Sequence, residues 1–444
     1  MLFDETSTPA KYLVLSFAGA IILGTILLAL PFASADGTGT GILDALFTAT
    51  SATCVTGLVV LDTGGHFSTF GQAVILILIQ LGGLGIMTYS VFIGIALGMG
   101  VGLWQRQILK DSFGTQYTGK VGGLVVRIIL LVVAVEAIGT LLMFFHWRGI
   151  AGSTSGALWL SVFHSVSAFC NAGFSTFSNS LENYRGDLYI NTVFMFLIIA
   201  GGLGFVVIFE LAGYAANRKK RDPLSLHTRT VLISTGSLIV IGATLIYILE
   251  SVHSLRGMGS FEGFMAAFFQ SVTSRTAGFN TIPTGAISNS TLMVITALMF
   301  IGASPGGTGG GIKTTTAAIF LADFNSYMRG REPEMSKRCI ERQLVEKAYI
   351  IIILSMALVT GATFALMVFE PHMDAMKLFF ESVSAFGTVG LSTGITTQFG
   401  GLSKIVITIT MFAGRVGPLT LALAMGGRAS RGNYRYPEGK LFIG

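Results

Sequence analysis

Eight long apolar segments restrict this chain to one class of fold. They lie at residues 11–30, 70–97, 121–145, 190–214, 230–249, 292–324, 348–369 and 405–425. Each is long enough to cross the hydrocarbon core of a bilayer, which takes about 20 apolar residues in a helix. A spanning helix satisfies its own backbone hydrogen bonds, so we expect an all-α integral membrane protein with eight transmembrane helices.

Composition and charge agree with a membrane protein. Hydrophobic residues make up 52% of the chain and charged residues 11%, whereas about a quarter of the residues of a soluble protein are charged. The first apolar segment has the length of a spanning helix and lacks a signal-peptide cleavage pattern, so we expect it to be retained. The net charge of +6 comes from basic residues beside apolar segments. Orientation in the bilayer explains their position better than nucleic-acid binding does.

A short apolar segment and a glycine-ended loop lie between the long segments of each pair. The short segments, residues 42–52, 158–168, 262–273 and 375–385, cannot cross the bilayer and are predicted to be re-entrant half-helices. The chain therefore divides into unit one (1–110), unit two (111–222), unit three (223–340) and unit four (341–444). Two crossings return the chain to the side where it started, so four pseudo-repeated units can surround one axis.

The four loops are the candidate functional site. They are Thr53, Cys54, Val55, Thr56 and Gly57; Phe169, Cys170, Asn171, Ala172 and Gly173; Ser274, Arg275, Thr276, Ala277 and Gly278; and Phe386, Gly387, Thr388, Val389 and Gly390. Glycine reaches backbone angles that clash for other residues, so these loops can turn carbonyl oxygens inward. Rings of carbonyls replace the hydration shell of a cation, and each half-helix directs its partially negative C-terminal end at the centre. Four loops in corresponding positions favour a cation-selective pore over ordinary glycine turns.

Side chains within the loops are expected to lie behind them. A cation beside a cation pore is costly, so Arg275 should point away and bond the loop or the half-helices from behind. Cys54 and Cys170 are expected to pack as small apolar residues. The three cysteines, which include Cys339, have neither the even number of a disulfide framework nor metal-ligand spacing. Glu136, in the first helix of unit two, is expected to be a helix contact outside the site.

A glycine-rich stretch, residues 304–316, interrupts the last helix of unit three. Its candidate gate residues are Ser304, Gly306, Gly307, Thr308, Gly309, Gly310, Gly311 and Lys313. Broken helix is tolerated in a membrane only beside protein or a water-filled cavity, so we predict a gate loop below the pore loops; a static kinked helix is the alternative. Arg415 lies at the corresponding place in unit four, where it can bond carbonyls of the gate loop and oppose cations. The motifs at residues 82–85 and 201–204 predict close helix packing.

The loop sequences SATCVTGL, SAFCNAGF, SRTAGFNT and SAFGTVGLS, with the C-terminal YPEGKLFIG, resemble the membrane subunits of Ktr-type potassium transporters in the Trk/Ktr/HKT superfamily. The resemblance covers essentially the whole chain, and the missing N-terminal helix pair of Trk-type relatives favours the Ktr branch. It implies a pore like that of a potassium channel. The resemblance implies that glycine at the first filter position of all four units is typical of potassium-preferring members. Serine at that position in one unit is typical of sodium-preferring relatives. We therefore expect transport of K⁺, no covalent cofactor and no enzymatic activity; whether Na⁺ activates or accompanies the flux stays open.

The resemblance also implies partners: a homodimer, and a cytosolic RCK-type (KtrA-like) nucleotide-binding ring that regulates the gate. It would dock on the basic segments between the units, which the excess of Lys and Arg predicts to be cytoplasmic. The protein is therefore expected in the cell (plasma or inner) membrane, with both termini in the cytoplasm. These basic residues are Arg106, Lys110, Lys120, Arg218, Lys219, Lys220, Arg221, Arg229, Arg329, Arg331, Lys337, Arg338, Arg342, Lys347, Arg428, Arg431, Arg435 and Lys440.

Two other functions fit parts of the sequence. One is a sodium-selective member of the same superfamily. The other is an intramembrane serine hydrolase, because the run from Gly302 to Gly306 around Ser304 matches the nucleophile-elbow pattern. That run lacks the strand–turn–helix context of the pattern, and no histidine has an evident claim to be its base.

Overall fold

The computed structural model is mostly helical over the residues that it describes, 9–85, 88, 91, 121–150, 152–216 and 224–425. Each unit begins with one long helix, namely α1 (Pro9–Ala29), α7 (Val121–Trp147), α11 (Leu226–Glu250) and α15 (Arg342–Phe369). All four are long and apolar enough to cross a membrane. The basic residues predicted between units one and two, those at 218–221 and the C-terminal motif YPEGKLFIG lie outside the described residues.

The predicted half-helices are present, and their C-terminal halves are buried. They are α2 (Ile42–Thr53), α8 (Thr154–Phe169), α12 (Ser260–Thr273) and α16 (Ala375–Gly387). The helix α8 begins earlier than predicted because the side chain of Ser153 caps it by accepting a hydrogen bond from the backbone N–H of Gly156. Asp374 caps α16 in the same way, through Lys377. The helices α8 and α16 therefore start at polar side-chain caps, α2 and α12 start after Gly41 and Gly259 without one, and all four end inside the protein.

The second helix of each unit is interrupted, which corrects the prediction of continuous helices over 190–214 and 405–425. The segments are α4 (Thr69–Leu84), α9 (Leu188–Leu203) with α10 (Phe205–Ala216), α13 (Asn289–Phe300) with α14 (Thr314–Met328), and α17 (Gly401–Val416) with α18 (Pro418–Met425). The breaks at Gly204 and Gly417 have φ values of +92° and +91°, which a right-handed helix cannot contain. At Gly204 the axis bends by 104°. Beyond Gly85, residues 88 and 91 are the described part of the predicted helix 70–97.

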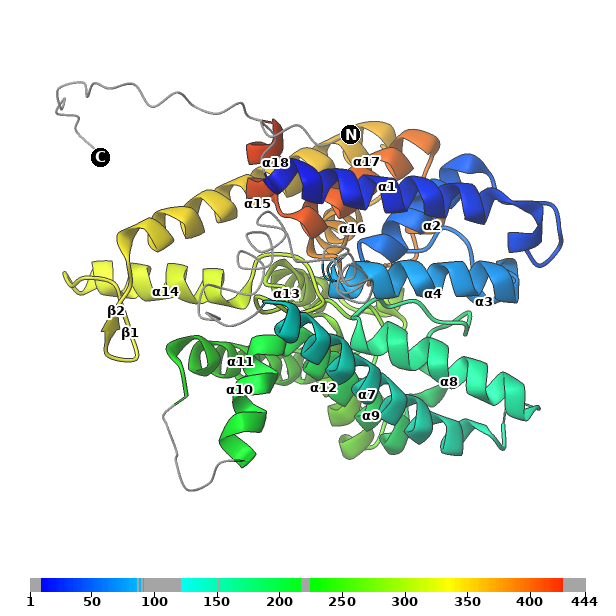
Figure 1. The fold of residues 1–444 in the computed structure, drawn as a ribbon, viewed down its shortest axis with the longest axis horizontal. Coiled ribbons are helices and arrows are strands. Elements are labelled where there is room, and N and C mark those ends of the chain that lie inside the picture. The colour runs from blue at the N-terminus through cyan, green and yellow to red at the C-terminus, as the bar shows by residue number, and fades with distance from the viewer. Residues whose placement is uncertain are drawn as a thin grey trace.

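Helices from different units pack in a closed succession around the molecule (Figure 1). The second helix of each unit contacts the half-helix of the next, in the pairs α4 with α8, α9 with α12, α13 with α16, and α17 with α2. Buried side chains follow the same course, since one apolar cluster joins units one and two and extends into unit three, and a second joins units three and four. A third cluster, which includes Phe47 and Met411, joins unit four to unit one. The half-helices are thereby held together at the centre.

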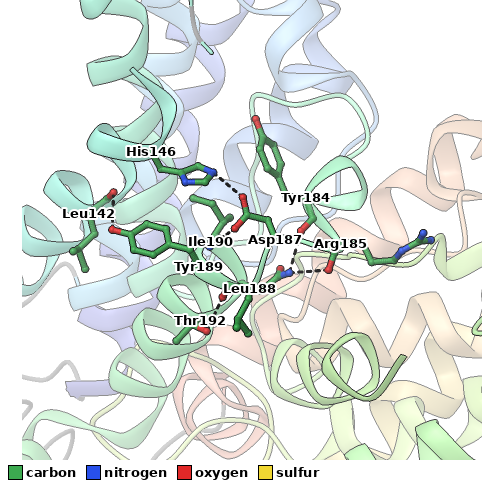
Figure 2. Close-up of polar contacts among 10 residues, drawn as sticks. Leu142, His146, Tyr184, Arg185, Asp187, Leu188, Tyr189, Ile190 and Thr192 are labelled. Carbon is green, nitrogen blue, oxygen red and sulfur yellow. Dashed lines mark hydrogen bonds and ion pairs between the residues drawn. The ribbon is translucent and has the colours of Figure 1, made fainter. Parts of the chain in front are cut away.

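Polar contacts join the long helix of a unit to the start of its second helix. In unit two, Nε2 of His146 lies 2.7 Å from Oδ2 of Asp187, whose other oxygen accepts from the backbone N–H of Ile190 (Figure 2). The ring of Tyr189 stacks on His146, and its hydroxyl donates to the carbonyl of Leu142. In unit three, Glu250 accepts hydrogen bonds from Ser288. In unit four, Glu370 accepts them from Gly400 and Ser403. These contacts fix the helix pairs that hold the loops.

The short antiparallel strands β1 (Glu334–Met335) and β2 (Arg338–Cys339) form a hairpin between α14 and α15. In Figure 1 this hairpin lies at the opposite end of the molecule from α3 (Thr63–His66). Cys339 is exposed there, whereas Cys54 and Cys170 are buried, and all three thiols are free.

Candidate functional site

The four loops meet at their glycines. Gly57, Gly173, Gly278 and Gly390 all have positive φ, between +70° and +89°. A methyl group placed on Gly57 would lie 3.0 Å from Cα of Gly173, and one on Gly173 would lie 3.1 Å from Cα of Gly278. A methyl group on Gly278 would lie 3.2 Å from Cα of Gly390, and one on Gly390 would lie 2.9 Å from Cα of Gly57. The four glycines therefore form a closed ring in chain order, with no room for a side chain.

A backbone carbonyl lies at each junction of this ring. The oxygens of Thr56, Ala172, Ala277 and Val389, the residues before the four glycines, each lie against the glycine of a neighbouring unit. Within the described part of the chain, none of these four oxygens accepts a hydrogen bond. Buried carbonyls normally have a partner. A dehydrated cation at the ring would supply one to all four oxygens at once.

The amide groups of the loops point the other way, toward the half-helices. In unit one, Thr56 N–H donates to the carbonyl of Ser51 over 2.8 Å, and Gly57 N–H donates to the Ser51 hydroxyl over 3.1 Å. Ser384 makes the same pair of contacts in unit four, with Val389 and Gly390. The N–H groups of these loops thus donate to the half-helices behind them, whereas the carbonyl oxygens at the ring accept no hydrogen bond from the described residues.

A second residue in each loop has a left-handed backbone. Val55, Asn171, Thr276 and Thr388 have φ values of 59°, 59°, 79° and 49°. Positive φ is uncommon for residues other than glycine and strained for β-branched ones, and it persists only where surrounding contacts impose it. All four residues are fully buried. The same backbone conformation at the same distance before the glycine indicates that the loops share one design.

In unit three, one residue fewer than in unit one separates the glycine of the ring from the half-helix residue that accepts the hydrogen bond of the loop. There Ala277 N–H donates to Thr273, four residues back, whereas the bond from Thr56 reaches five residues back to Ser51. Arg275, 7% exposed, turns away from the ring. Its guanidinium donates to the carbonyls of Thr235 on α11 and Gly302. The direction agrees with the expectation, but the partners are the first helix and the chain before the gate loop, and neither the pore loop nor a half-helix.

The gate loop, residues 304–316, is closed at its base and attached to unit two. Gly302 N–H donates to the carbonyl of Ile312 over 2.8 Å, which brings the two ends of the loop together. Ser304 N–H donates to Gly202 over 3.0 Å, and Thr308 N–H donates to Gly201 over 3.1 Å. The loop therefore packs on the end of α9, beside the break at Gly204.

Two basic side chains contact carbonyls of the gate loop. The Lys313 ammonium donates to Gly309 over 2.8 Å. The Arg415 guanidinium, from unit four, donates to the carbonyl of Thr308 and to that of Gly82 in unit one. The motif at residues 82–85, predicted to pack closely, contacts the pore loops: a methyl on Gly83 would lie 2.7 Å from Sγ of Cys170. Arg415 thus links the gate loop to α4, the helix on which Gly83 contacts Cys170.

Two carboxyl groups near the loops were absent from the predicted site. Oε2 of Glu136 accepts from the Gln80 side chain over 3.1 Å, and the thiol of Cys170 donates to Gln80 over 3.4 Å. Glu136 therefore reaches a pore-loop residue, and an acid within an apolar segment was the available signal. Glu381 on α16 is fully buried and accepts from Ser392 and Thr393 after the loop of unit four. No local motif marks it.

Comparisons with known proteins give the family of the chain. A family model described as TrkH, cation transport protein, matches residues 5–430. Ktr system potassium uptake protein B of Bacillus subtilis (strain 168) is 39% identical over 98% of this chain and 97% of its own length. Potassium/sodium uptake protein NtpJ of Enterococcus hirae is 35% identical over 98% of this chain and 97% of its own. The crystal structure of the potassium transporter TrkH from Vibrio parahaemolyticus has a TM-score of 0.75 at 19% identity, over 95% of this chain and 86% of that one.

The chain belongs to the TrkH family of cation transport proteins, and it is a multi-pass membrane protein. Within that family it is a KtrB-type transporter, as the loop sequences predicted. Proteins of this family and the relatives found are transporters and not enzymes, which excludes the serine hydrolase.

Proposed function

We propose that the chain carries potassium ions into the cell through the ring formed by Gly57, Gly173, Gly278 and Gly390. The observation that carries this proposal is the ring of four carbonyl oxygens without hydrogen-bond partners. Oxygens of this kind replace the hydration shell of a cation without adding fixed charge. Relatives named potassium uptake proteins, at 39% and 37% identity, support K⁺ as the ion.

The proposal includes the surroundings of the ring. Four pseudo-repeated units with eight crossings surround one pore, the four pore loops form its filter, and the gate loop with Arg415 and Lys313 opposes flow below it. Relatives named as parts of a Ktr system support a regulatory partner. That partner is a cytosolic nucleotide-binding ring that docks on a homodimer in the cell membrane, with both termini of the chain in the cytoplasm.

Replacement of Gly57 tests the filter. The variant Gly57→Ser is expected to lower the ratio of potassium to sodium uptake, because its side chain would displace the carbonyl of Ala172. Uptake of radioactive rubidium and sodium by liposomes that contain the purified protein measures the ratio. Gly213→Ser on α10, where a side chain meets nothing, is the control. An unchanged ion ratio in folded Gly57→Ser protein would overturn the assignment of the filter.

A sodium-transporting member of the same family is the second candidate. The relative named potassium/sodium uptake protein NtpJ favours it, at 35% identity. The wild-type measurement in the same liposomes separates the two candidates. Sodium uptake equal to or above rubidium uptake would replace the proposal, whereas a clear preference for rubidium supports it.

A further inference from the structure

We infer that the gate loop and the filter act as one coupled unit, in which Thr388 is a positioning residue that ties the closed loop to the filter. This inference rests on the proposed function and adds a consequence to it. The ion preference of the filter then depends on whether the loop is closed.

The contact between Gly310 and Thr388 is the centre of the argument. The N–H of Gly310 donates to the hydroxyl of Thr388 over 3.0 Å. Thr388 is fully buried and has a φ of 49°. A β-branched residue keeps such a backbone only when its surroundings impose it. The closed loop supplies part of that restraint, so removal of the loop weakens a strained position in the filter.

Three glycines of the loop lie so close to the filter that a side chain on any of them would press against it. A methyl group on Gly310 would lie 2.9 Å from Cγ2 of Thr388, and one on Gly309 would lie 2.8 Å from Cβ of Thr276. A methyl group on Gly311 would lie 3.3 Å from Cα of Gly387. Close approach to the filter therefore explains these glycines, in addition to any need for flexibility.

The loop also contacts the filter in unit two. The hydroxyl of Thr308 donates to the carbonyl of Phe169 over 3.2 Å, and the side chain of Asn171 bonds the hydroxyl of Thr276 over 3.2 Å. The filter segments of units two, three and four therefore all touch the loop or its direct neighbours. Opening of the loop must break hydrogen bonds to filter residues. By linkage, ions that stabilise the filter also favour the closed loop.

Removal of the Thr388 hydroxyl tests the coupling. Thr388→Val keeps the branched shape and is expected to raise rubidium uptake about fivefold, because a hydrogen bond of ~1 kcal/mol no longer holds the loop. The ratio of potassium to sodium uptake should fall in the same liposomes. Thr388→Ser keeps the hydroxyl and should change both values less than Thr388→Val does. Thr296→Val is the matched control, since that buried hydroxyl bonds only within α13.

A second pair of variants keeps the test decisive if Thr388→Val does not fold. Gly310→Ala places a methyl 2.5 Å from Oγ1 and 2.9 Å from Cγ2 of Thr388, and it should raise uptake and lower the ion ratio. Gly310→Ala with Thr388→Ser removes Cγ2 and lets the remaining oxygen rotate away from the methyl, so it should recover part of both values. Higher uptake at an unchanged ion ratio would overturn the coupling, as would wild-type behaviour of Thr388→Val or Gly310→Ala. Neither result touches the proposed function, which fails only if the wild-type protein does not prefer potassium or if Gly57→Ser leaves the preference unchanged.

Discussion

Arg275 and Arg415 show two ways in which an arginine lies near the proposed path for cations. Arg275 turns behind the filter and donates to the carbonyls of Thr235 and Gly302. Arg415 donates to Thr308 in the gate loop and to Gly82 in the helix of unit one. Hydrogen bonds from a charged donor are stronger than neutral ones. Arg275 therefore stabilises the frame of the filter, whereas Arg415 holds the element proposed to move.

Replacement of Arg415 should release the gate loop. Arg415→Ala removes the donor to Thr308 and a positive charge below the proposed filter, so rubidium uptake should rise at least about tenfold, since a hydrogen bond from a charged group contributes ~1.5–3 kcal/mol. Arg415→Lys keeps the charge but loses the fork of donors and should give an intermediate rate. Liposome uptake measures both. Arg127→Ala, at an exposed position on α7, is the control. Uptake at or below wild type in folded Arg415→Ala protein would contradict the role.

The loop residues could be predicted from sequence, but most of their partners could not. Glycine at one place in four corresponding loops is a local pattern, and a positive φ explains why it recurs. Arg415, by contrast, bonds residues 107 and 333 positions away in the chain. The contact of Glu136 with Gln80 spans 56 positions. Such pairs depend on how the helices pack against one another, and the spacing of apolar residues along the chain does not predict that packing.

The breaks in the second helices lie at single glycine residues, which a hydropathy pattern averaged over many residues does not reveal. Residues 190–214 and 405–425 are largely apolar, so their pattern predicts uninterrupted crossings. The structure instead turns at Gly204 and Gly417, each with a φ near +90°. Pro418 follows the second break and lacks the N–H that would continue the helix. Beside the first break, Phe205 N–H donates to the carbonyl of Gly306, so the turn in unit two supports the gate loop of unit three.

A side chain at the break in unit two should destabilise the protein. Gly204→Ala forces alanine to a φ of +92° and directs its methyl into the carbonyl of Pro305. With a ψ of 141°, this backbone lies in a region that residues with a Cβ atom rarely adopt, at a cost of about 1–3 kcal/mol. The midpoint of thermal unfolding in detergent, followed by the loss of folded protein in size-exclusion chromatography, should therefore fall.

Gly213→Ala on α10 is the control for this prediction. A methyl there meets nothing within 4 Å, and alanine is the better helix former by roughly 1 kcal/mol. Its midpoint should stay equal or rise. Equal midpoints for Gly204→Ala and Gly213→Ala would show that the break carries no strain and that the helix tolerates a side chain at its turn.

The ring of four units is closed where the end of the chain meets its beginning. Unit four contacts unit one through α17 and α2, and the apolar cluster between them includes Phe47 and Met411. At the same junction Gly390 meets Gly57 in the filter. The sequence predicts four similar units but not this junction, because 360 positions separate its ion pair, Lys404 and Asp44. Closure follows from the shape of the packed helices.

Reversal of one charge at this junction should weaken the closed ring. Nζ of Lys404 lies 2.6 Å from Oδ1 of Asp44, with side chains 17% and 28% exposed. Lys404→Glu places two carboxylates together and should lower the thermal midpoint by a few degrees, since a partly exposed pair contributes up to ~1 kcal/mol. The ratio of potassium to sodium uptake should also fall, because the junction holds Gly390 against Gly57. Arg342→Glu, which breaks an exposed pair within α15, should leave both values unchanged.

Exchange of the two charged residues tests whether the charge of the Asp44–Lys404 pair causes the changes in midpoint and ion ratio. Asp44→Lys with Lys404→Glu restores opposite signs and should recover most of the midpoint and of the ion ratio. If the exchange recovers neither value while the protein still folds, the Lys404 side chain acts through its packing beside Asp44 and not through its charge. If it recovers the midpoint but not the ratio, closure of the ring and selection at the glycines are separate properties. Recovery of both would link a contact between the two ends of the chain to the choice of ion at the centre.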